Sequence, residues 1–224
     1  MPMKSKFTVD DIVDAAFSIS REEGLDKCSA RAIAHRMQSS TMPIYSCLSS
    51  MKELEDAVRK KAVDLLISYS TKDRTGNVFL DMGVGYIMFA KSEKHLFRML
   101  FLSEATEEAI GLRKRFKEYV MTALLEKLTD FEPLKEFSEE QKRKLMDRSW
   151  VFNHGLAMLL NNSLIDDLDE KQVAELLMDN GIFMIVGERM RDKVYKSTDV
   201  KRFLKQSGFE YLCEQKGTAL RFST

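Results

Sequence analysis

The side chains best suited to bind another molecule gather in residues 29–54, close to the N-terminus. Thr41, Tyr45 and Ser46 carry hydroxyl groups at a spacing that puts them on one side of a helix. Arg31 lies a short way upstream and carries a permanent positive charge. Hydroxyl and guanidinium groups donate hydrogen bonds to phosphate oxygens and to base edges. This stretch therefore indicates recognition of a nucleic acid rather than bond cleavage.

The same stretch predicts two short helices joined by a tight turn that contains Gln38. Ser29 is placed to cap the first helix, and Ser40 is placed to cap the second. Pro43 falls in the first turn of the second helix. Its missing N–H costs little there, because the N–H groups of a first turn have no partner within the helix.

An apolar side on each short helix lets the two pack together. Ile44 and Leu48 lie one turn apart on the second helix, and both can pack on Ile33 of the first. The outward side of the second helix then carries Thr41, Met42, Tyr45 and Ser46. A short helix with such side chains, held at a steep angle to its neighbour, has the geometry that enters a DNA major groove.

These residues follow a known family pattern. The run Ser29-x-Arg31-x-Ile33-Ala34, followed by Ser40, Ile44-Tyr45 and Leu54, resembles the helix-turn-helix of the TetR (tetracycline-repressor-like) family. The resemblance covers residues 7–56. The sequence departs from the family pattern at Gln38, where a glycine is usual, at Leu48, where an aromatic residue is usual, and at Met51, where the usual lysine is displaced to Lys52.

The resemblance implies an all-α protein with two parts. Residues 1–52 form a three-helix, helix-turn-helix DNA-binding domain, and residues 53–224 form a helical domain for ligand binding and dimerisation. It also implies a homodimeric transcriptional regulator, most simply a repressor. Such a protein binds a double-stranded DNA operator and leaves it when a small hydrophobic effector binds.

The resemblance and the expected geometry together assign the DNA contacts. Phosphates are expected to meet Ser29, Arg31, Tyr45 and Lys52, with Lys6 in the preceding arm. Ser40, at the start of the reading helix, is also expected among the DNA-binding residues. Base edges are expected to meet Thr41, Met42 and Ser46. A mobile N-terminal tail that touches nothing is an equal alternative for Lys6.

The rest of the chain has the apolar spacing of helices throughout. Helices are expected at residues 8–23, 52–70, 78–92, 95–102, 106–128, 138–161, 170–190 and 199–214. Thr8 with Asp11, and Ser138 with Gln141, have the form of capping boxes at two of the helix starts.

The helical domain offers a candidate ligand pocket. Trp150 and His154 lie one turn apart, so they share a side of their helix. The expected pocket lining is Tyr86, Phe89, Phe97, Phe116, Trp150 and His154, which would suit an aromatic or hydrophobic ligand. Ordinary core packing is the alternative, with His154 as a buried, hydrogen-bonded residue that joins two helices.

The two long helices expected at residues 138–161 and 170–190 are the candidate dimer interface. Two-fold dimers on near-palindromic sites are the usual arrangement for such DNA-binding proteins. We expect a four-helix interface with the partner protomer, with Ile182 and Ile185 at its apolar centre.

Composition limits the other functions. The chain has 35 basic and 35 acidic residues, so no overall field draws it to nucleic acid or membrane. Its three cysteines include no C-x-x-C pair, which favours a reducing compartment. No apolar run is long enough to span a bilayer. A cytoplasmic protein with no membrane partner is expected.

Catalytic and cofactor signatures are missing from the sequence. The three histidines have no metal-binding spacing, and no nucleophile elbow or phosphate loop occurs, so we expect no metal, no cofactor and no enzyme activity. Gly83-x-Gly85 lies inside an expected helix and is better explained as a packing site or a kink. A helical small-molecule-binding or interaction protein that has lost DNA binding is the alternative function, because of the departures at Gln38 and Met51.

Overall fold

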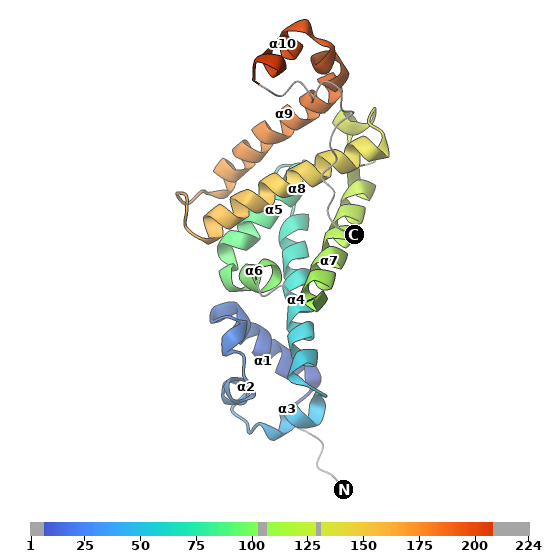
Figure 1. Cartoon of the computed structure of the whole chain (residues 1–224). Coiled ribbons are helices and arrows are strands. Elements are labelled where there is room, and N and C mark those ends of the chain that lie inside the picture. The colour runs from blue at the N-terminus through green and yellow to red at the C-terminus, as the bar shows by residue number, and fades with distance from the viewer. Residues whose placement is uncertain (1–6, 103–106, 129–130, 208–224) are drawn as a thin grey trace.

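Helices make up the regular structure of this protein. The computed structural model describes residues 7–102, 107–128 and 131–207, and no strand occurs within these ranges. The predicted all-α class is therefore confirmed. Figure 1 shows α1, α2 and α3 at one end of an elongated molecule, with α10 at the opposite end and α4 leading from the first group into the body.

Three helices and a short 3-10 turn form the N-terminal group: α1 (Val9–Glu22), η1 (Leu25–Lys27), α2 (Ala30–Arg36) and α3 (Met42–Cys47). The predicted capping box of α1 is confirmed. The Asp11 N–H donates to the Thr8 hydroxyl at 3.2 Å, and the Thr8 N–H donates to the Asp11 carboxylate at 2.7 Å. Both bonds satisfy N–H groups that the helix itself leaves without partners.

The caps of α2 and α3 differ. Ser29 caps α2 as predicted, because its hydroxyl accepts a hydrogen bond from the Ala32 N–H at 3.2 Å. The predicted Ser40 cap on α3 is wrong: the helix starts one residue later, with Thr41 at its N-cap and no side-chain capping bond. A cap at Ser40 would accept from the N–H of residue 42 or 43, and Pro43 has none.

The buried core of the N-terminal group continues into the body. Ile12, Ile33 and Ile44 are buried together with Leu54 and Val58 of α4, and the same cluster reaches α5 and α8. The boundary drawn at residues 52 and 53 therefore does not coincide with a break in the core.

The body contains the remaining helices: α4 (Met51–Thr71), α5 (Val78–Ser92), α6 (Lys94–Phe101), α7 (Glu107–Leu128), η2 (Glu132–Leu134), α8 (Glu139–Asn161), α9 (Glu170–Lys196) and α10 (Thr198–Gln206). Helix α9 extends beyond the predicted end at Met190, and α10 ends before the predicted limit at Glu214, which lies outside the described residues. None of the described helices is long and apolar enough to cross a membrane.

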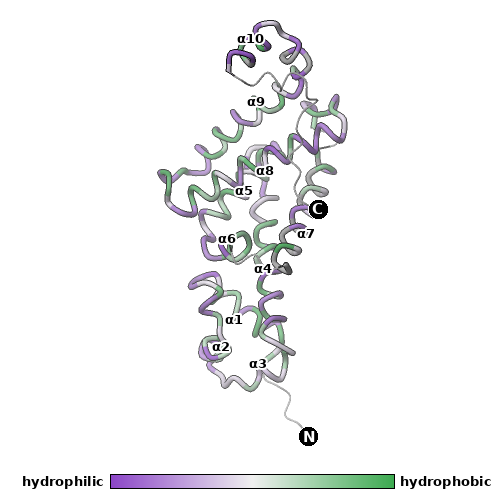
Figure 2. Tube along the Cα trace, viewed as in Figure 1, coloured by the Kyte–Doolittle hydropathy of each residue, from purple (hydrophilic) through white to green (hydrophobic). Residues whose placement is uncertain are grey.

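Helix α5 is the centre of the body. Every residue from Gly83 to Ala90 is buried, and α5 packs against α4, α8 and α9. Figure 2 shows the hydrophobic colour along α5. At Gly85 the two helices α4 and α5 come so close that a methyl group there would overlap the α4 backbone. The interpretation of Gly83-x-Gly85 as a packing site is thus confirmed.

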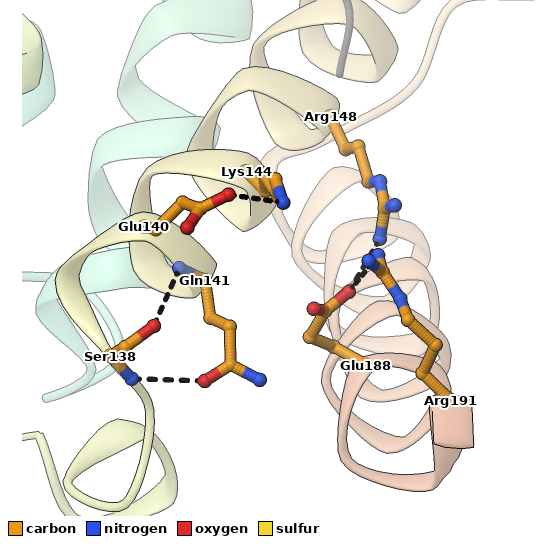
Figure 3. Close-up of polar contacts among 7 residues, drawn as sticks. All are labelled: Ser138, Glu140, Gln141, Lys144, Arg148, Glu188 and Arg191. Carbon is orange, nitrogen blue, oxygen red and sulfur yellow. Dashed lines mark hydrogen bonds and ion pairs between the residues drawn. The ribbon is translucent and has the colours of Figure 1, made fainter. Parts of the chain in front are cut away.

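Polar contacts stabilise the first half of α8 and the C-terminal part of α9 (Figure 3). The predicted Ser138–Gln141 capping box of α8 is confirmed, with the Gln141 N–H donating to the Ser138 hydroxyl at 3.3 Å and the Ser138 N–H donating to the Gln141 side chain at 3.0 Å. Arg148 of α8 donates to Glu188 of α9 at 3.0 Å, and Arg191 bonds the same buried carboxylate. The Arg148–Glu188 bond joins the two helices that the sequence assigned to dimerisation.

The turn between α2 and α3 gives the first testable prediction. Gln38 has a φ of 50°, as predicted for the position where the family pattern has glycine. A side chain in this left-handed region costs on the order of 1 kcal/mol. Gln38→Gly should therefore raise the melting temperature by a few degrees, measured by circular dichroism.

The neighbouring residue provides the control. Ser39 is not among the positive-φ residues of the described chain, so Ser39→Gly should lower stability through the added freedom of the unfolded chain. A Gln38→Gly variant that melts below the parent would show that the Gln38 side chain contributes more than its backbone strain costs.

Candidate nucleic-acid interface and ligand cavity

Helix α3 presents a sharply divided surface. Ile44 and Leu48 are buried against the core, whereas the side chains of Met42 and Tyr45 are 76% and 67% exposed. Ser46 is also exposed, and Thr41 is partly so. The apolar contact of one side fixes the helix, and the other side is free to meet a partner.

The start of α2, which precedes α3 in the sequence, carries a positive charge at Arg31. Ser29 and Arg31 are exposed, and Arg31 forms no ion pair with a described residue. Arg36, at the other end of α2, is bound by Glu22 at 2.7 Å and is not free. Arg31 is therefore the cation of α2 that remains available to an external anion.

The outward surface of α2 and α3 is compatible with a phosphate backbone. Neither helix contains an acidic residue, so no carboxylate of these helices would repel an approaching phosphate. Lys52, in the first turn of α4, and Ser40, in the turn, are exposed. Lys6 lies outside the described residues.

The body contains a partly open cavity of about 240 Å³. Helices α4, α5, α7, α8 and α9 supply its walls. The lining side chains are mostly apolar, with hydroxyl and amide groups among them: Leu66, Ile67, Ser70, Thr71, Phe79, Leu80, Met82, Gly83, Tyr86, Tyr119, Met121, Met146, Ser149, Trp150, Asn153, Leu177, Asn180, Gly181 and Met184.

The predicted pocket residues divide into two groups around this cavity. Tyr86 and Trp150 line it. Phe89 and Phe97 do not, and their prediction as pocket wall is corrected: both are fully buried in the core. Phe89 turns toward α4, where its ring meets Tyr69, and Phe97 lies on α6, which forms no part of the wall. The side chain of Phe116 lies outside the described residues.

His154 is placed behind the wall rather than in it. Its Nδ1 shares a hydrogen bond of 2.7 Å with the Tyr86 hydroxyl, and its ring stacks on Trp150 at a centroid distance of 6.0 Å. Its place in the predicted lining is therefore corrected. The geometry matches the alternative interpretation, in which His154 joins two helices, here α5 and α8.

Burial keeps this end of the cavity uncharged. It lowers the pKa of His154 below the ordinary value of 6.5, so the imidazole is neutral at pH 7. Burial also raises the pKa of the Tyr86 hydroxyl, which stays protonated. Neither group supplies a charge to a molecule in the cavity.

The polar groups of the cavity were not singled out from the sequence. Ser70, on α4, and Asn153, on α8, reach the cavity with no hydrogen bond to another described residue. A lone Ser or Asn does not by itself indicate a ligand site, and nothing in the spacing of these two distinguishes them. Asn153 does lie one turn from Trp150, so the side of the helix that contains the tryptophan was a usable signal.

No family model matches the sequence, and no curated protein matches it. Among the described residues, no group of three or more His, Cys, Asp or Glu side chains could hold a metal ion.

Proposed function

We propose that this protein is a DNA-binding transcriptional regulator of the TetR type, a repressor that leaves its operator when a small hydrophobic molecule binds. The observation that carries the proposal is the division of α3. The residues of the TetR-like pattern fold so that Ile44 is buried while Met42 and Tyr45 face outward. A short helix held from behind, with an exposed front, suits insertion into the major groove.

The proposed contacts separate positioning from reading. Arg31, Ser29 and Tyr45 hold phosphates and carry no base preference, with Lys52 and Lys6 as further phosphate contacts. The base edges meet Thr41, Met42 and Ser46 of the same surface.

The cavity is the proposed effector site. A cavity of about 150 Å³ with apolar walls accepts benzene, so the 240 Å³ found here suits a molecule with about two fused rings. The lining contributed by α4, α5, α8 and α9 includes no charged side chain. A charged ligand would meet no counter-ion on these four helices, and a charge taken out of water without a counter-ion costs several kcal/mol. The effector is therefore an uncharged, largely apolar molecule that hydrogen-bonds Asn153 or Ser70.

Helix α4 connects the cavity with the DNA-binding end. Ser70 lines the cavity, and the hydroxyl of the adjacent Tyr69 donates to Glu93 at 3.1 Å. Glu93 also accepts two hydrogen bonds from Arg21 of α1, at 2.7 and 2.5 Å. A ligand that displaces α4 thereby shifts the position of α1. This shift changes the distance between the two α3 helices of a dimer.

A second copy of the chain is the proposed partner of α8 and α9. Both helices expose large apolar side chains: Val151 and Leu159 on α8, and Leu176, Ile182, Phe183, Val186 and Met190 on α9. Exposed apolar patches of this kind mark interfaces. Ile185 has to be replaced as a centre of the interface, because it is half-buried and packs inside the protomer with Phe137 and Met146.

The assembly gives a testable prediction at the exposed positions. Phe183 is 77% exposed and Val186 is 52% exposed, so two carboxylates there should leave the protomer fold intact while opposing burial between two copies. Phe183→Glu combined with Val186→Glu should convert dimers to monomers in light scattering. The exposed charge reversal Lys193→Glu on the same helix is the control and should remain dimeric. A double variant of dimeric mass would place the interface elsewhere.

Two binding measurements test the function as a whole. The full-length protein should retain particular fragments from a sheared genomic DNA library, and an uncharged two-ring probe such as 2-naphthol should release them. The same probe should quench Trp150, the only tryptophan, because its side chain lines the cavity. If no fragment is retained over random DNA, the proposal fails.

A small-molecule-binding protein without DNA binding is the second candidate, because the cavity alone supports it. In that case the probe quenches Trp150 although no DNA fragment is retained. The geometry at Gln38 favours the first candidate. Its φ of 50° preserves the turn that the family pattern makes with glycine.

A further inference from the structure

The outward surface of α3 lacks the side chains that read most bases. The helix Met42–Cys47 contains no Arg, Lys, Asn, Gln, Asp or Glu, and Thr41 at its N-cap is also uncharged. Guanine is usually read by Arg or Lys and adenine by Asn or Gln, each through two hydrogen bonds in the major groove. None of these paired contacts is open to α3.

One base remains readable by an apolar side chain. Thymine projects its C5-methyl group into the major groove, where apolar side chains contact it. Met42 is 76% exposed, more than Tyr45 at 67%, and its neighbours in sequence include the hydroxyl-bearing Thr41, Tyr45 and Ser46. Methionine is flexible and polarisable, so it can fit closely against a methyl group.

The position of Met42 gives the contact a defined direction. Pro43 follows it and has a fixed φ, and Ile44, 2% exposed, attaches the same turn to the core. The Met42 backbone is thereby held, and only its side chain can adjust. The absence of acids in α2 and α3 and the unpaired Arg31 suit a polyanion as the molecule that covers this surface.

We propose that α3 recognises thymine C5-methyl groups, chiefly through Met42 with the Thr41 methyl beside it. The inference rests on the proposed DNA-binding function and deepens it, since it names what the reading surface detects. Sequence preference then comes from methyl groups, and guanine contributes no paired hydrogen bonds to α3.

Deoxyuridine isolates the methyl group, because it differs from thymidine only there and keeps its base pair. Burying one methyl group changes affinity by about fourfold. A symmetric pair of substitutions in the two half-sites should therefore weaken binding by about 15-fold. Substitutions at thymines outside the half-sites should have no effect.

The experiment starts from an operator selected from random duplexes by the full-length protein. Each half-site thymine is replaced by deoxyuridine in turn, and affinity is measured by fluorescence anisotropy. Met42→Ala should bind the thymine operator more weakly than the parent and should no longer distinguish it from the deoxyuridine operator. Tyr45→Phe, which removes only a proposed phosphate contact, should keep the full deoxyuridine effect. Circular dichroism checks that both variants fold.

The possible failures are distinct. If the selected operator is insensitive to deoxyuridine but loses binding when its guanines become 7-deazaguanine, the inference is overturned and the DNA-binding function stands. If Gln38→Ala, rather than Met42→Ala, abolishes the deoxyuridine effect, the assignment to α3 is wrong. If no sequence is selected at all, the proposed function fails, and the inference fails with it.

Discussion

Replacing Arg21 with alanine is expected to lower the free energy of unfolding by about 3 kcal/mol. Arg21 of α1 donates two hydrogen bonds to Glu93, whose carboxylate is only 4% exposed. Without Arg21, the carboxylate keeps a single donor among the described contacts, the Tyr69 hydroxyl. A buried charge left without its counter-ion is costly, and the half-exposed position of Arg21 puts the effect at the lower end of the usual range.

A second substitution tests this explanation. Glu93→Gln removes the buried charge, so Arg21→Ala combined with Glu93→Gln should be more stable than Arg21→Ala alone. The measurement is urea unfolding of Arg21→Ala, Glu93→Gln and the double variant, monitored by circular dichroism. If the double variant is less stable than Arg21→Ala, the unpaired carboxylate is not the source of the loss.

Replacing Gly85 with alanine is expected to cost about 3 kcal/mol or more, because α4 and α5 touch there through their backbones. An ideal Cβ at Gly85 would lie 2.1 Å from the Tyr69 carbonyl oxygen and 2.6 Å from the Ser70 Cα. No rotamer change can relieve an overlap with main-chain atoms, so the two helices must separate. Ser70 lines the cavity, and the separation should also weaken binding of a probe ligand.

The control is a glycine inside a helix, in its second turn, with open space around it. A Cβ at Gly111 of α7 would meet nothing within 4 Å. Gly111→Ala should therefore raise stability by up to about 1 kcal/mol through helix propensity. Thermal unfolding of both variants separates the two cases. A Gly85→Ala variant that melts like the parent would contradict the close approach of α4 and α5.

The local features of the fold could be predicted from the sequence. The caps at Thr8, Ser29 and Ser138 depend on residues three positions away, and all three have the predicted bonds. The cap at Ser40 failed, although the reason was also local. Pro43 has no N–H to donate, so a serine three residues before it lacks that donor for its cap.

Facing and long-range contacts could not be predicted in the same way. Neighbouring positions on a helix point about 100° apart, so apolar composition did not decide that Phe89 faces α4 rather than the cavity. For the same reason, Ile185 was predicted at the centre of the dimer interface although it is half-buried within the protomer. The nearby Phe183 is the exposed side chain. The Arg21–Glu93 pair joins residues 72 positions apart, and no local pattern indicates it.

The central claim is that α2 and α3 form the DNA-reading surface. Contacts with base edges distinguish such a surface from one that binds DNA non-specifically. Thr41 lies on the proposed reading side, whereas Tyr45 and Arg31 are assigned to phosphates. A phosphate contact contributes equally to every sequence, and a base contact contributes only to the operator.

The most direct test is the affinity of Thr41→Ala, Tyr45→Phe and Arg31→Ala for the selected operator and for random DNA, measured at several salt concentrations. Tyr45→Phe and Arg31→Ala should weaken both DNAs by a similar factor, and Arg31→Ala should also reduce the salt dependence. Thr41→Ala should lose more affinity for the operator than for random DNA. If all three variants remain folded dimers and bind the operator like the parent, α2 and α3 are not the reading surface.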